Sequence, residues 1–280
     1  MPYDDTAAQP PTYAGTVVLI TGGTAGIGLA CAERLHAKGA TLVLVARSPT
    51  GLARCEAHFR ERVHTIQADV GTDDGCRKII DWVDNSTGNV KVLINNAGVH
   101  HRGLFRELDE GKICSMVDVN LKAPMRLAYA LLPKLIESRG VIVNIASLAG
   151  CIPLAGSSAY SATKFGIRAW SMAMADELAE SGVRVCCVSP GPVRTGFILD
   201  SLDSVTDMTL SQPMVTPASV ADAVMSASKT GQIDVCIPVS SGRLAKLGYL
   251  LPGLRRLLSP ILSKRGAKRR RRLLDEQRRR

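Results

Sequence analysis

Seven short runs of β-branched and aliphatic residues recur along this chain, and a helical segment follows each of the first six. The runs are almost continuously apolar, which is typical of strands that are covered on both faces. Because such strands alternate with helices, the connections are right-handed crossovers between parallel strands. The pattern therefore predicts an α/β fold with a doubly wound, parallel, seven-stranded sheet and helices on both faces.

The strands and helices are expected at regular intervals. The predicted strands are 16–21, 41–46, 63–68, 90–95, 140–147, 183–189 and 233–239. The predicted helices are 26–38, 49–61, 73–84, 110–138, 157–181 and 217–229. A long loop, 191–217, is unusually apolar, with Phe197, Ile198, Leu199, Leu202, Val205, Met208, Leu210 and Met214. It favours an apolar substrate that the loop covers, and simple packing of these residues on the domain is the alternative.

The first strand leads through a glycine-rich turn into a helix, in the stretch LITGGTAGIGLACAERL (19–35). Gly22, Gly26 and Gly28 allow a sharp turn that brings backbone N–H groups close to an anion. The helix that follows presents the positive end of its dipole to the same place. This arrangement predicts a binding site for the diphosphate of a dinucleotide, and a merely structural turn is the alternative.

The end of the second strand indicates which dinucleotide would bind. A carboxylate usually stands there to hold a ribose 2′-hydroxyl, but this strand ends in Ala46, Arg47 and Ser48. A guanidinium can instead bind a 2′-phosphate through charge-assisted hydrogen bonds. We therefore predict NADP(H) rather than NAD(H), and a plain surface role for Arg47 is the alternative.

The stretch SAYSATKFG (158–166) places a phenol one helical turn from an ammonium. Tyr160 and Lys164 lie on the same side of a helix, and a nearby ammonium lowers the pKa of a phenol. Such a tyrosine can exchange protons near neutral pH. Ser147 ends the fifth strand, so its side chain is expected in the same crevice at the carboxyl ends of the strands.

Together these segments resemble the short-chain dehydrogenase/reductase family over about residues 14–240. The matching segments are T-G-G-T-A-G-I-G (21–28), Asp69, N-N-A-G (95–98), Asn120, Ser147, Y-S-A-T-K (160–164) and P-G-P-V-R-T (190–195). The resemblance implies a Rossmann-type fold and a nicotinamide-dependent oxidoreductase, and Arg47 matches the NADP-preferring branch.

The resemblance also implies roles for individual residues. Tyr160 would be the catalytic acid/base, Lys164 would bind the nicotinamide ribose and lower the tyrosine pKa, Ser147 would polarise the substrate oxygen, and Asn120 would hold a water that links Lys164 to solvent. Asp69 and Val70 would flank the adenine, Asn96 to Gly98 would line the cofactor near its ribose, and Val193 and Thr195 would hold its carboxamide and phosphates. The full set implied for the cofactor is Thr21, Gly22, Thr24, Gly26, Ile27, Gly28, Arg47, Ser48, Asp69, Val70, Asn96, Ala97, Gly98, Tyr160, Lys164, Pro190, Gly191, Val193 and Thr195.

The expected activity is hydride transfer between NADP(H) and a secondary alcohol or ketone, with a lipophilic substrate such as a steroid, retinoid or lipid. Two alternatives stay open: a 3-oxoacyl-thioester reductase, and a non-catalytic NADPH-binding scaffold at a membrane surface. His100 and His101 follow the N-N-A-G segment and either border the substrate pocket or are solvated. Family resemblance also implies a homodimer or homotetramer that pairs through 110–138 and 157–181.

Charge divides the chain into a near-neutral body and a basic tail. Fourteen of the 35 Lys and Arg residues, but two of the 25 acidic residues, lie in 243–280. We expect a disordered N-terminal arm (1–13), one Rossmann-type catalytic domain (14–242) and a basic amphipathic tail (243–280). The eight cysteines have no C-x-x-C spacing, and the N-terminus lacks an apolar signal core. The expectation is a cytoplasmic protein with reduced cysteines and no metal site.

The tail alternates leucines with Arg and Lys at helical spacing, and Pro252 and Pro260 are expected to break it into short pieces. Such a segment can lie on an anionic membrane surface. Alternatively, its leucines dock over the substrate pocket or a neighbouring subunit and leave only 264–280 in solvent. No aromatic interleaving or binding motif favours nucleic acid as a partner.

Overall fold

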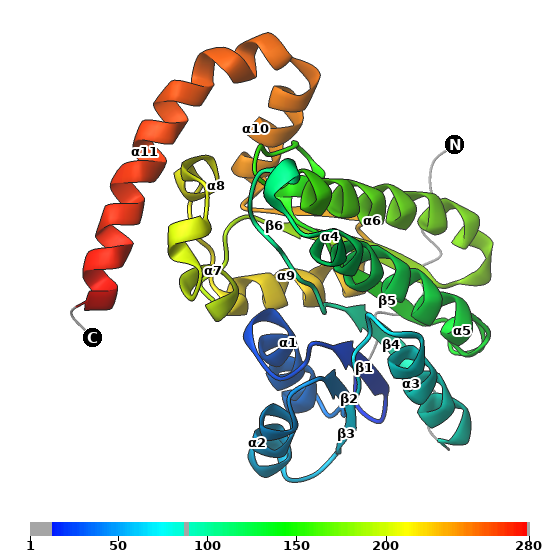
Figure 1. The fold of residues 1–280 in the computed structure, drawn as a ribbon. Helices are drawn as coiled ribbons and strands as arrows, with labels where there is room; N and C mark the ends of the chain where they lie inside the picture. Colours follow the sequence, from blue (N-terminus) through cyan, green and yellow to red (C-terminus); the bar gives the residue numbers. More distant parts are fainter. Residues whose placement is uncertain (1–12, 87–89, 279–280) are drawn as a thin grey trace.

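The computed structural model describes residues 13–86 and 90–278, and within them the chain forms a seven-stranded, all-parallel sheet (Figure 1). The strands are β1 (Val17–Thr21), β2 (Thr41–Ala46), β3 (Val63–Gln67), β4 (Val90–Asn95), β5 (Val141–Ile145), β6 (Arg184–Pro190) and β7 (Asp234–Ile237). Their order across the sheet is β3-β2-β1-β4-β5-β6-β7. The predicted doubly wound α/β fold is therefore confirmed.

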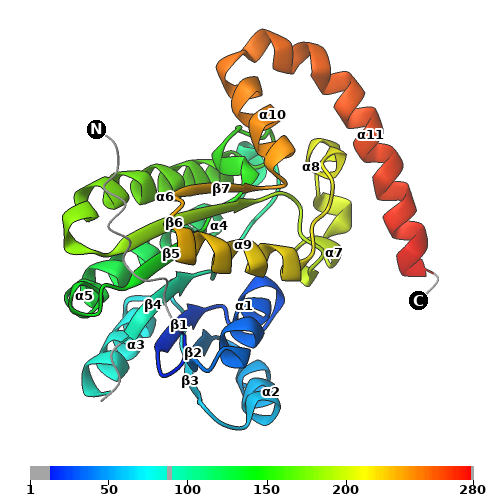
Figure 2. The same cartoon turned by 180° about the vertical axis from the view of Figure 1, so that it is seen from behind.

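Helices cover both faces of the sheet (Figures 1 and 2). One face is covered by α1 (Gly26–Ala37), α2 (Pro49–Phe59) and α9 (Pro217–Thr230), and the other by α3 (Asp73–Asn85), α4 (Glu110–Val117), α5 (Ala123–Glu137) and α6 (Ser158–Glu177). Successive strand residues enter opposite layers: Ile20 packs with α1 and α9, and its neighbour Leu19 packs with α3 and α5. Burial on both faces explains why the strands are continuously apolar.

Strand order reverses at β1, which lies between β2 and β4. The crossover connections from β1 and β4 therefore run to opposite sides, and a crevice opens at the carboxyl ends of these strands. Thr21, Asn95 and Pro190 end the strands that border it. The fold thus brings the glycine turn after β1 and the segment after β5 to one edge of the sheet.

The predicted disordered arm, 1–13, lies outside the described residues except for Tyr13. Tyr13 is buried, and it packs in the core layer that contains α1 and α2. The expectation of disorder is therefore wrong at this residue, because its ring covers apolar surface at the start of the sheet.

The segment predicted as one helix, 110–138, contains a π-helical turn, η2 (Asp118–Lys122), between α4 and α5. Pro124 lacks a backbone N–H, so it cannot give the α-helical hydrogen bond to the carbonyl of Asn120, four residues earlier. A wider turn at this point accords with that missing donor. Insertions of this kind are frequent at functional sites.

The predicted loop 191–217 folds into three short helical turns, α7 (Gly196–Leu199), η5 (Leu202–Ser204) and α8 (Asp207–Ser211). Part of its apolar content is buried, but against the tail and not on the domain as the alternative interpretation held. Ile198, Leu202, Val205 and Leu210 form a separate small core with Leu273 from the tail. Other short turns are η1 (Phe105–Glu107), η3 (Leu148–Gly150) and η4 (Ala179–Ser181).

The tail forms two helices, α10 (Val239–Leu250) and α11 (Pro252–Arg278), and α11 runs beside α8 (Figure 1). Pro252 separates the two helices as predicted, since proline fits the first turn of a helix. Pro260 does not break α11, and that prediction is wrong. Pro260 lies on the exposed side, where water can bond the carbonyl that loses its helical partner.

The docked part of the tail includes Ala245 of α10 and extends through 264–277, the segment that was expected in solvent. Gly266 packs so closely on α8 that a Cβ atom there would lie 1.8 Å from the carbonyl oxygen of Asp207. Arg269 donates to the carbonyls of Leu210 and Gln212, and Arg270 donates to the carbonyl of Val205. Backbone carbonyls of the 191–217 segment thus hold the arginines that the charge pattern had assigned to solvent.

Candidate active site

Glycines shape the turn between β1 and α1. Gly22 and Gly26 have φ angles of +66° and +54°, which favour glycine, and a Cβ on Gly28 would lie 2.2 Å from the carbonyl oxygen of Gly22. No side chain caps the N-terminus of α1 at Ala25, and its first turn carries no acid. The free N–H groups of this helix end can therefore bind an anion.

The N-N-A-G segment holds the glycine turn in place. Asn96 donates its Nδ2 to the carbonyls of Thr21 and Gly22 at 2.9 and 3.0 Å. Thr21 Oγ1 accepts the backbone N–H groups of Asn96 and Ala97 at 3.0 and 3.1 Å. The polar side-chain atoms of Thr21 and Asn96 are therefore engaged with backbone, and these residues position the turn.

The end of β2 forms the outer end of the crevice. Arg47 is 68% exposed in its side chain, and its Nη1 lies 3.8 Å from Oδ2 of Asp69. Ser48 caps α2 by accepting the N–H of Gly51 at 3.1 Å, and the side chain of Thr24 packs against Gly51. The glycine turn and the second strand–helix junction therefore meet here.

Asp69 and Val70 occupy the next junction along the sheet, after β3. Asp69 accepts the N–H of Gly71 through Oδ1 at 2.9 Å, and Val70 is buried. The structure thus places Asp69 beside Arg47, where the adenosine end of a dinucleotide is expected.

Tyr160 lies at the centre of the crevice and is 8% exposed. Ser147 lines the same cavity, and its Oγ accepts the N–H of Ala149 at 3.1 Å. Burial raises the pKa of Tyr160, while the neighbouring hydroxyl of Ser147 and the charge of Arg102 lower it in part. Tyr160 is therefore a protonated phenol in this arrangement, and not the acidified one that the sequence predicted.

Lys164 lies beneath the ring of Tyr160 and not at its oxygen. Its Nζ donates to the carbonyl of Ile145 at 2.8 Å and lies 5.8 Å from the centroid of the Tyr160 ring. Burial lowers the pKa of Lys164 to about 8. The expected acidifying effect on Tyr160 is absent here because the lysine extends to β5, a contact that i,i+4 spacing does not reveal.

Asn120 fastens the loop after β4 to α6. Its Oδ1 accepts the N–H of Val99 at 2.8 Å, and its Nδ2 donates to the Val99 carbonyl at 2.9 Å and to Thr163 Oγ1 at 3.2 Å. A Cβ on Gly98 would lie 3.3 Å from Asn120 Oδ1 and 3.8 Å from Lys164 Nζ. Asn120 and Lys164 therefore come together at Gly98.

The segment after β6 closes over the glycine turn. Gly191 donates its N–H to the carbonyl of Ile237 at 2.7 Å, and Val193 forms a bridge with Val215. The methyl group of Thr195 lies 3.1 Å from where a Cβ on Gly26 would be. The first and last parts of the predicted cofactor site thus face each other.

The sequence left open whether His100 borders the pocket or is solvated, and it did not identify Arg102 as a residue of the site. His100 stacks on Tyr160 and shares a hydrogen bond with Ser157 at 3.0 Å, and burial lowers its pKa to about 3. Arg102 donates to Ser201 Oγ at 2.8 Å and to the carbonyl of Phe197 at 3.3 Å. The only indication in the sequence that His100 and Arg102 belong to the site was their position just after N-N-A-G. That position did not show which way the loop would turn.

A cavity of about 930 Å³ joins these groups. Its lining includes the glycine turn, Ser147, Tyr160 and Lys164 at one end, and mostly apolar groups at the other. The apolar end is lined by Ile152, Met208, Leu258 and Leu262, while Leu154 lies near Tyr160 and Phe197 near Arg102. No group of three or more His, Cys, Asp or Glu residues with the arrangement of a metal site occurs in 13–86 and 90–278.

Comparisons with known proteins agree with this geometry. The profile of the short chain dehydrogenase family matches residues 16–204. A ketoacyl reductase, HetN, from a Nostoc species is 38% identical over 231 residues, which cover 81% of this chain and 79% of that protein.

Solved structures show the same fold. A short-chain dehydrogenase from Streptomyces avermitilis superimposes with a TM-score of 0.75 at 30% identity, over 88% of this chain and 96% of its own. A short-chain dehydrogenase from Sphingobium yanoikuyae in complex with NADPH gives 0.74 at 31% identity, over 86% and 95%.

Proposed function

Because the chain belongs to the short-chain dehydrogenase/reductase family, we propose that it transfers a hydride between NADP(H) and a secondary alcohol or ketone. The observation that carries the proposal is that the buried Tyr160 and Ser147 line the same cavity as the glycine turn. A proton donor and a dinucleotide site that share one cavity are what carbonyl reduction requires.

In the reduction direction, Tyr160 donates its proton to the carbonyl oxygen. The nicotinamide, when bound, supplies the hydride to the carbonyl carbon. Burial raises the pKa of Tyr160, so the phenol carries the proton that carbonyl reduction consumes. Ser147 orients the substrate oxygen through its hydroxyl.

Lys164 and Asn120 are proposed to return the proton to Tyr160. Burial lowers the pKa of Lys164 to about 8, so its amine can both give and take a proton near neutral pH. The side chain of Asn120 is hydrogen-bonded to Val99 and Thr163. The backbone carbonyl of Asn120 has no α-helical donor, because Pro124 lacks an N–H. We propose that this carbonyl holds the water that links Lys164 to solvent.

Three observations support NADP(H) as the cofactor. Arg47 is exposed at the end of β2, where a 2′-phosphate would lie, and no carboxylate ends that strand. Ser48 and Thr24 add hydroxyl groups beside it. The solved relative from Sphingobium yanoikuyae is a complex with NADPH.

The apolar end of the cavity supports a lipophilic substrate. The similarity to a ketoacyl reductase favours a second candidate, reduction of 3-oxoacyl thioesters. A non-catalytic scaffold is the weakest alternative, because Tyr160, Ser147, Lys164 and Asn120 all lie together.

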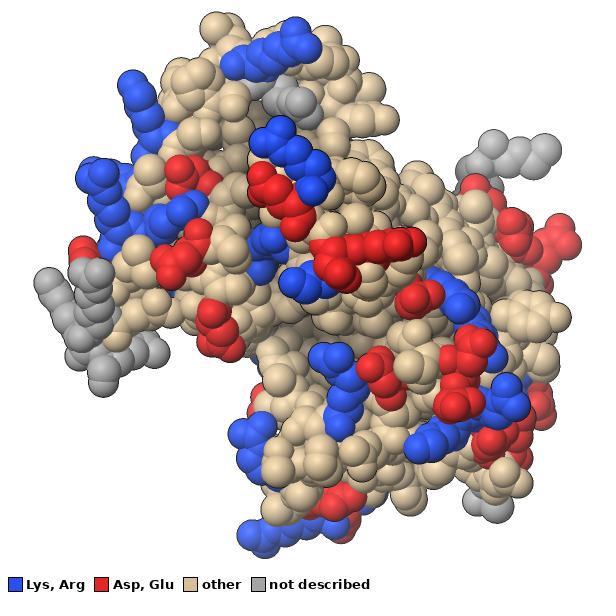
Figure 3. All heavy atoms as spheres, viewed as in Figure 1, with Lys and Arg blue, Asp and Glu red and all other residues tan. Residues whose placement is uncertain are grey.

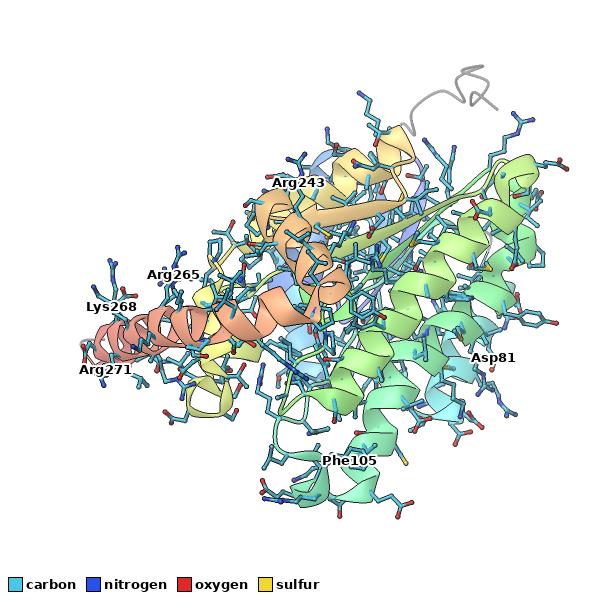
Figure 4. The ribbon with its side chains drawn as sticks, turned by 90° about the horizontal axis from the view of Figure 1, so that it is seen from above. Asp81, Phe105, Arg243, Arg265, Lys268 and Arg271 are labelled. Atoms are coloured by element: carbon cyan, nitrogen blue, oxygen red, sulfur yellow. The ribbon has the colours of Figure 1, made fainter. Side chains whose placement is uncertain are left out.

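A peripheral membrane location is proposed from the corner between α10 and α11. Leu250, Leu257 and Ile261 are 73%, 72% and 66% exposed there, and Leu258 nearby lines the cavity. Basic side chains gather on the part of the surface that carries α11, where Arg265 and Lys268 point outward from the same side (Figures 3 and 4). Exposed leucines beside a basic stripe suit an anionic bilayer surface. No helix in the described ranges is both long and apolar enough to cross a bilayer.

A homodimer or homotetramer, formed in the cytoplasm, also remains a proposal. Tyr129 on α5 is 83% exposed, and Met172 on α6 is exposed as well. Large apolar side chains on these two helices suit pairing with a second copy. Light scattering of the purified protein tests this, and a monomer at micromolar concentration would contradict it.

A turnover assay tests the main proposal. The purified protein is given NADPH or NADH with ketones, aldehydes, quinones, steroids and a 3-oxoacyl thioester, and loss of the reduced nicotinamide is followed by absorbance. We expect NADPH oxidation with apolar ketones. Preference for the thioester would select the second candidate, and NADPH binding without any turnover would select the scaffold.

A further inference from the structure

We propose that the substrate carries an anionic group close to its reacting carbonyl, and that Arg102 binds that group. The inference rests on the proposed oxidoreductase function and names the substrate class of the same site. Arg102 would then be a specificity-determining residue, which distinguishes amphiphilic carbonyl compounds from neutral ones.

Arg102 is a cation in the cavity that has only neutral partners. It donates to Ser201 Oγ and to the carbonyl of Phe197, and its guanidinium lies 5.6 Å from the centroid of the Phe197 ring. No carboxylate of 13–86 or 90–278 forms an ion pair with it. A half-buried guanidinium with five N–H donors and no counter-ion retains donors and charge for an anion.

Two acidic residues line the cavity: one forms an ion pair with another residue, and the other is exposed. Asp207 forms an ion pair with Arg270 of α11 at 3.0 Å. Asp200 is exposed at the end of α7. Neither carboxylate neutralises Arg102, so the field beside the catalytic tyrosine is positive. Burial lowers the pKa of Arg102 without removing its charge near neutral pH.

Arg102 acts at the reacting end of the cavity. Its charge lowers the pKa of Tyr160, and its loop neighbour His100 stacks on the tyrosine ring. An anion bound by Arg102 would therefore lie near the carbonyl that Tyr160 protonates. The apolar end, with Leu258 and Leu262, is left for a hydrocarbon chain.

A second, smaller cavity beside Arg102 is also lined by basic residues. It has a volume of about 400 Å³, adjoins the main cavity at Arg102, and is lined by Arg47, His101 and Lys112 without an acidic residue. Anionic groups would therefore be attracted along this side of the crevice.

Arg102 could instead serve only as a latch, since its two hydrogen bonds tie the loop after β4 to the segment around α7. A latch and an anion receptor make different predictions. Loss of a latch weakens the turnover of every substrate to a similar extent, whereas loss of a receptor weakens only the anionic ones.

The experiment compares a medium-chain oxo-carboxylate with its methyl ester, using NADPH and the full-length protein. Arg102→Met removes the charge, Arg102→Lys keeps it, and Arg106→Met is the matched control, since Arg106 is 81% exposed in the same loop. We expect the wild type to favour the acid in kcat/KM by about 10- to 100-fold. Arg102→Met should abolish that preference by lowering kcat/KM for the acid much more than for the ester, and Arg102→Lys should keep part of it.

An equal fall for acid and ester in Arg102→Met would overturn the proposal in favour of the latch. A wild type that favours the ester, or a neutral 3-oxoacyl thioester, would overturn it as well. In each of these cases the NADPH-dependent activity itself survives, so the proposed function stands while this inference fails.

Binding gives a readout that does not depend on turnover. The melting temperature of the NADPH-loaded protein is measured with a medium-chain alkyl carboxylate, sulfonate or phosphate, and with the matching alcohol. We expect stabilisation by the anions in the wild type and in Arg106→Met, and its loss in Arg102→Met. Equal shifts with the alcohol and the anions would contradict the inference, and the ranking of the three anions identifies the preferred head group.

Discussion

The imidazole ring of His100 lies flat on the phenol ring of Tyr160, with centroids 3.8 Å apart and planes inclined by 12°. His100 also shares a hydrogen bond with Ser157, the residue that precedes α6. The loop after β4 and the start of α6 therefore hold the tyrosine ring between them. The orientation of the Tyr160 ring is fixed by a side chain that contributes no charge, since burial lowers the pKa of His100 to about 3.

Replacing Tyr160 with phenylalanine should reduce kcat for ketone reduction by about a thousandfold, because the proton donor is lost and the ring is kept. NADPH affinity, measured by quenching of protein fluorescence or by calorimetry, should change by less than about threefold. Turnover close to that of the wild type would remove Tyr160 from the mechanism.

Replacing His100 with phenylalanine should make the protein less sensitive to acid. The pKa of a free histidine is about 6.5, and the folded value is about 3. The unfolded chain therefore binds the extra proton first, and stability is lost as the pH falls below 6.5. The wild type should lose about 2 kcal/mol between about pH 6.5 and pH 5 from this group.

Urea unfolding at the two pH values measures that loss. His100→Phe should show a smaller loss than the wild type, and the exposed His58→Phe should behave as the wild type does. An unchanged pH dependence in His100→Phe would show that His100 is not held neutral.

Replacing Arg47 with aspartate should shift cofactor preference from NADPH toward NADH. The change removes a cation beside the expected 2′-phosphate and introduces a carboxylate that can bind a 2′-hydroxyl. We expect the ratio of the two kcat/KM values to change by about a hundredfold. Arg54→Asp is the control: it makes the same charge change at an exposed position of α2, and we expect it to leave the ratio unchanged. A wild type that prefers NADH would contradict the NADP(H) assignment.

Replacing Gly266 with alanine should detach the end of α11, because its Cβ would lie 1.8 Å from the carbonyl oxygen of Asp207. We expect a loss of about 1–3 kcal/mol in unfolding free energy. Trypsin cleavage near Arg269 should also become faster. Gly253→Ala is the control, since nothing lies within 4 Å of the position of its Cβ. Equal proteolysis of both variants would show that α11 does not dock as described.

Reversing the charges of Arg265, Lys268 and Arg271 should release the protein from anionic vesicles. These side chains are exposed on α11, and each basic residue near a bilayer contributes about 1 kcal/mol. Co-sedimentation with vesicles that contain phosphatidylserine, at low and high salt, measures the effect. A control variant reverses three exposed charges on α2 and α3, at Arg54, Arg77 and Lys78. Equal binding by both variants would exclude α11 as the contact.

Sequence pattern alone determined the fold and most of the placement of the site. Continuous apolar runs specify buried parallel strands because periodicity and burial are linked within a few residues. Gly22 and Gly28 could be assigned to the turn between β1 and α1, because a tight turn leaves no room for a Cβ. Ser147 and Tyr160 could be paired because the carboxyl ends of parallel strands share one edge.

Tertiary structure decided what those residues experience. Lys164 reaches the carbonyl of Ile145 and Tyr160 is deprived of water, so the direction of the tyrosine pKa follows from burial and not from helical spacing. Arg102 meets Ser201 across 99 residues of chain, and Gly266 meets Asp207, which lies 59 positions earlier. Contacts of this range, and the desolvation that accompanies them, arise only when distant segments enclose a common cavity, which no local spacing encodes.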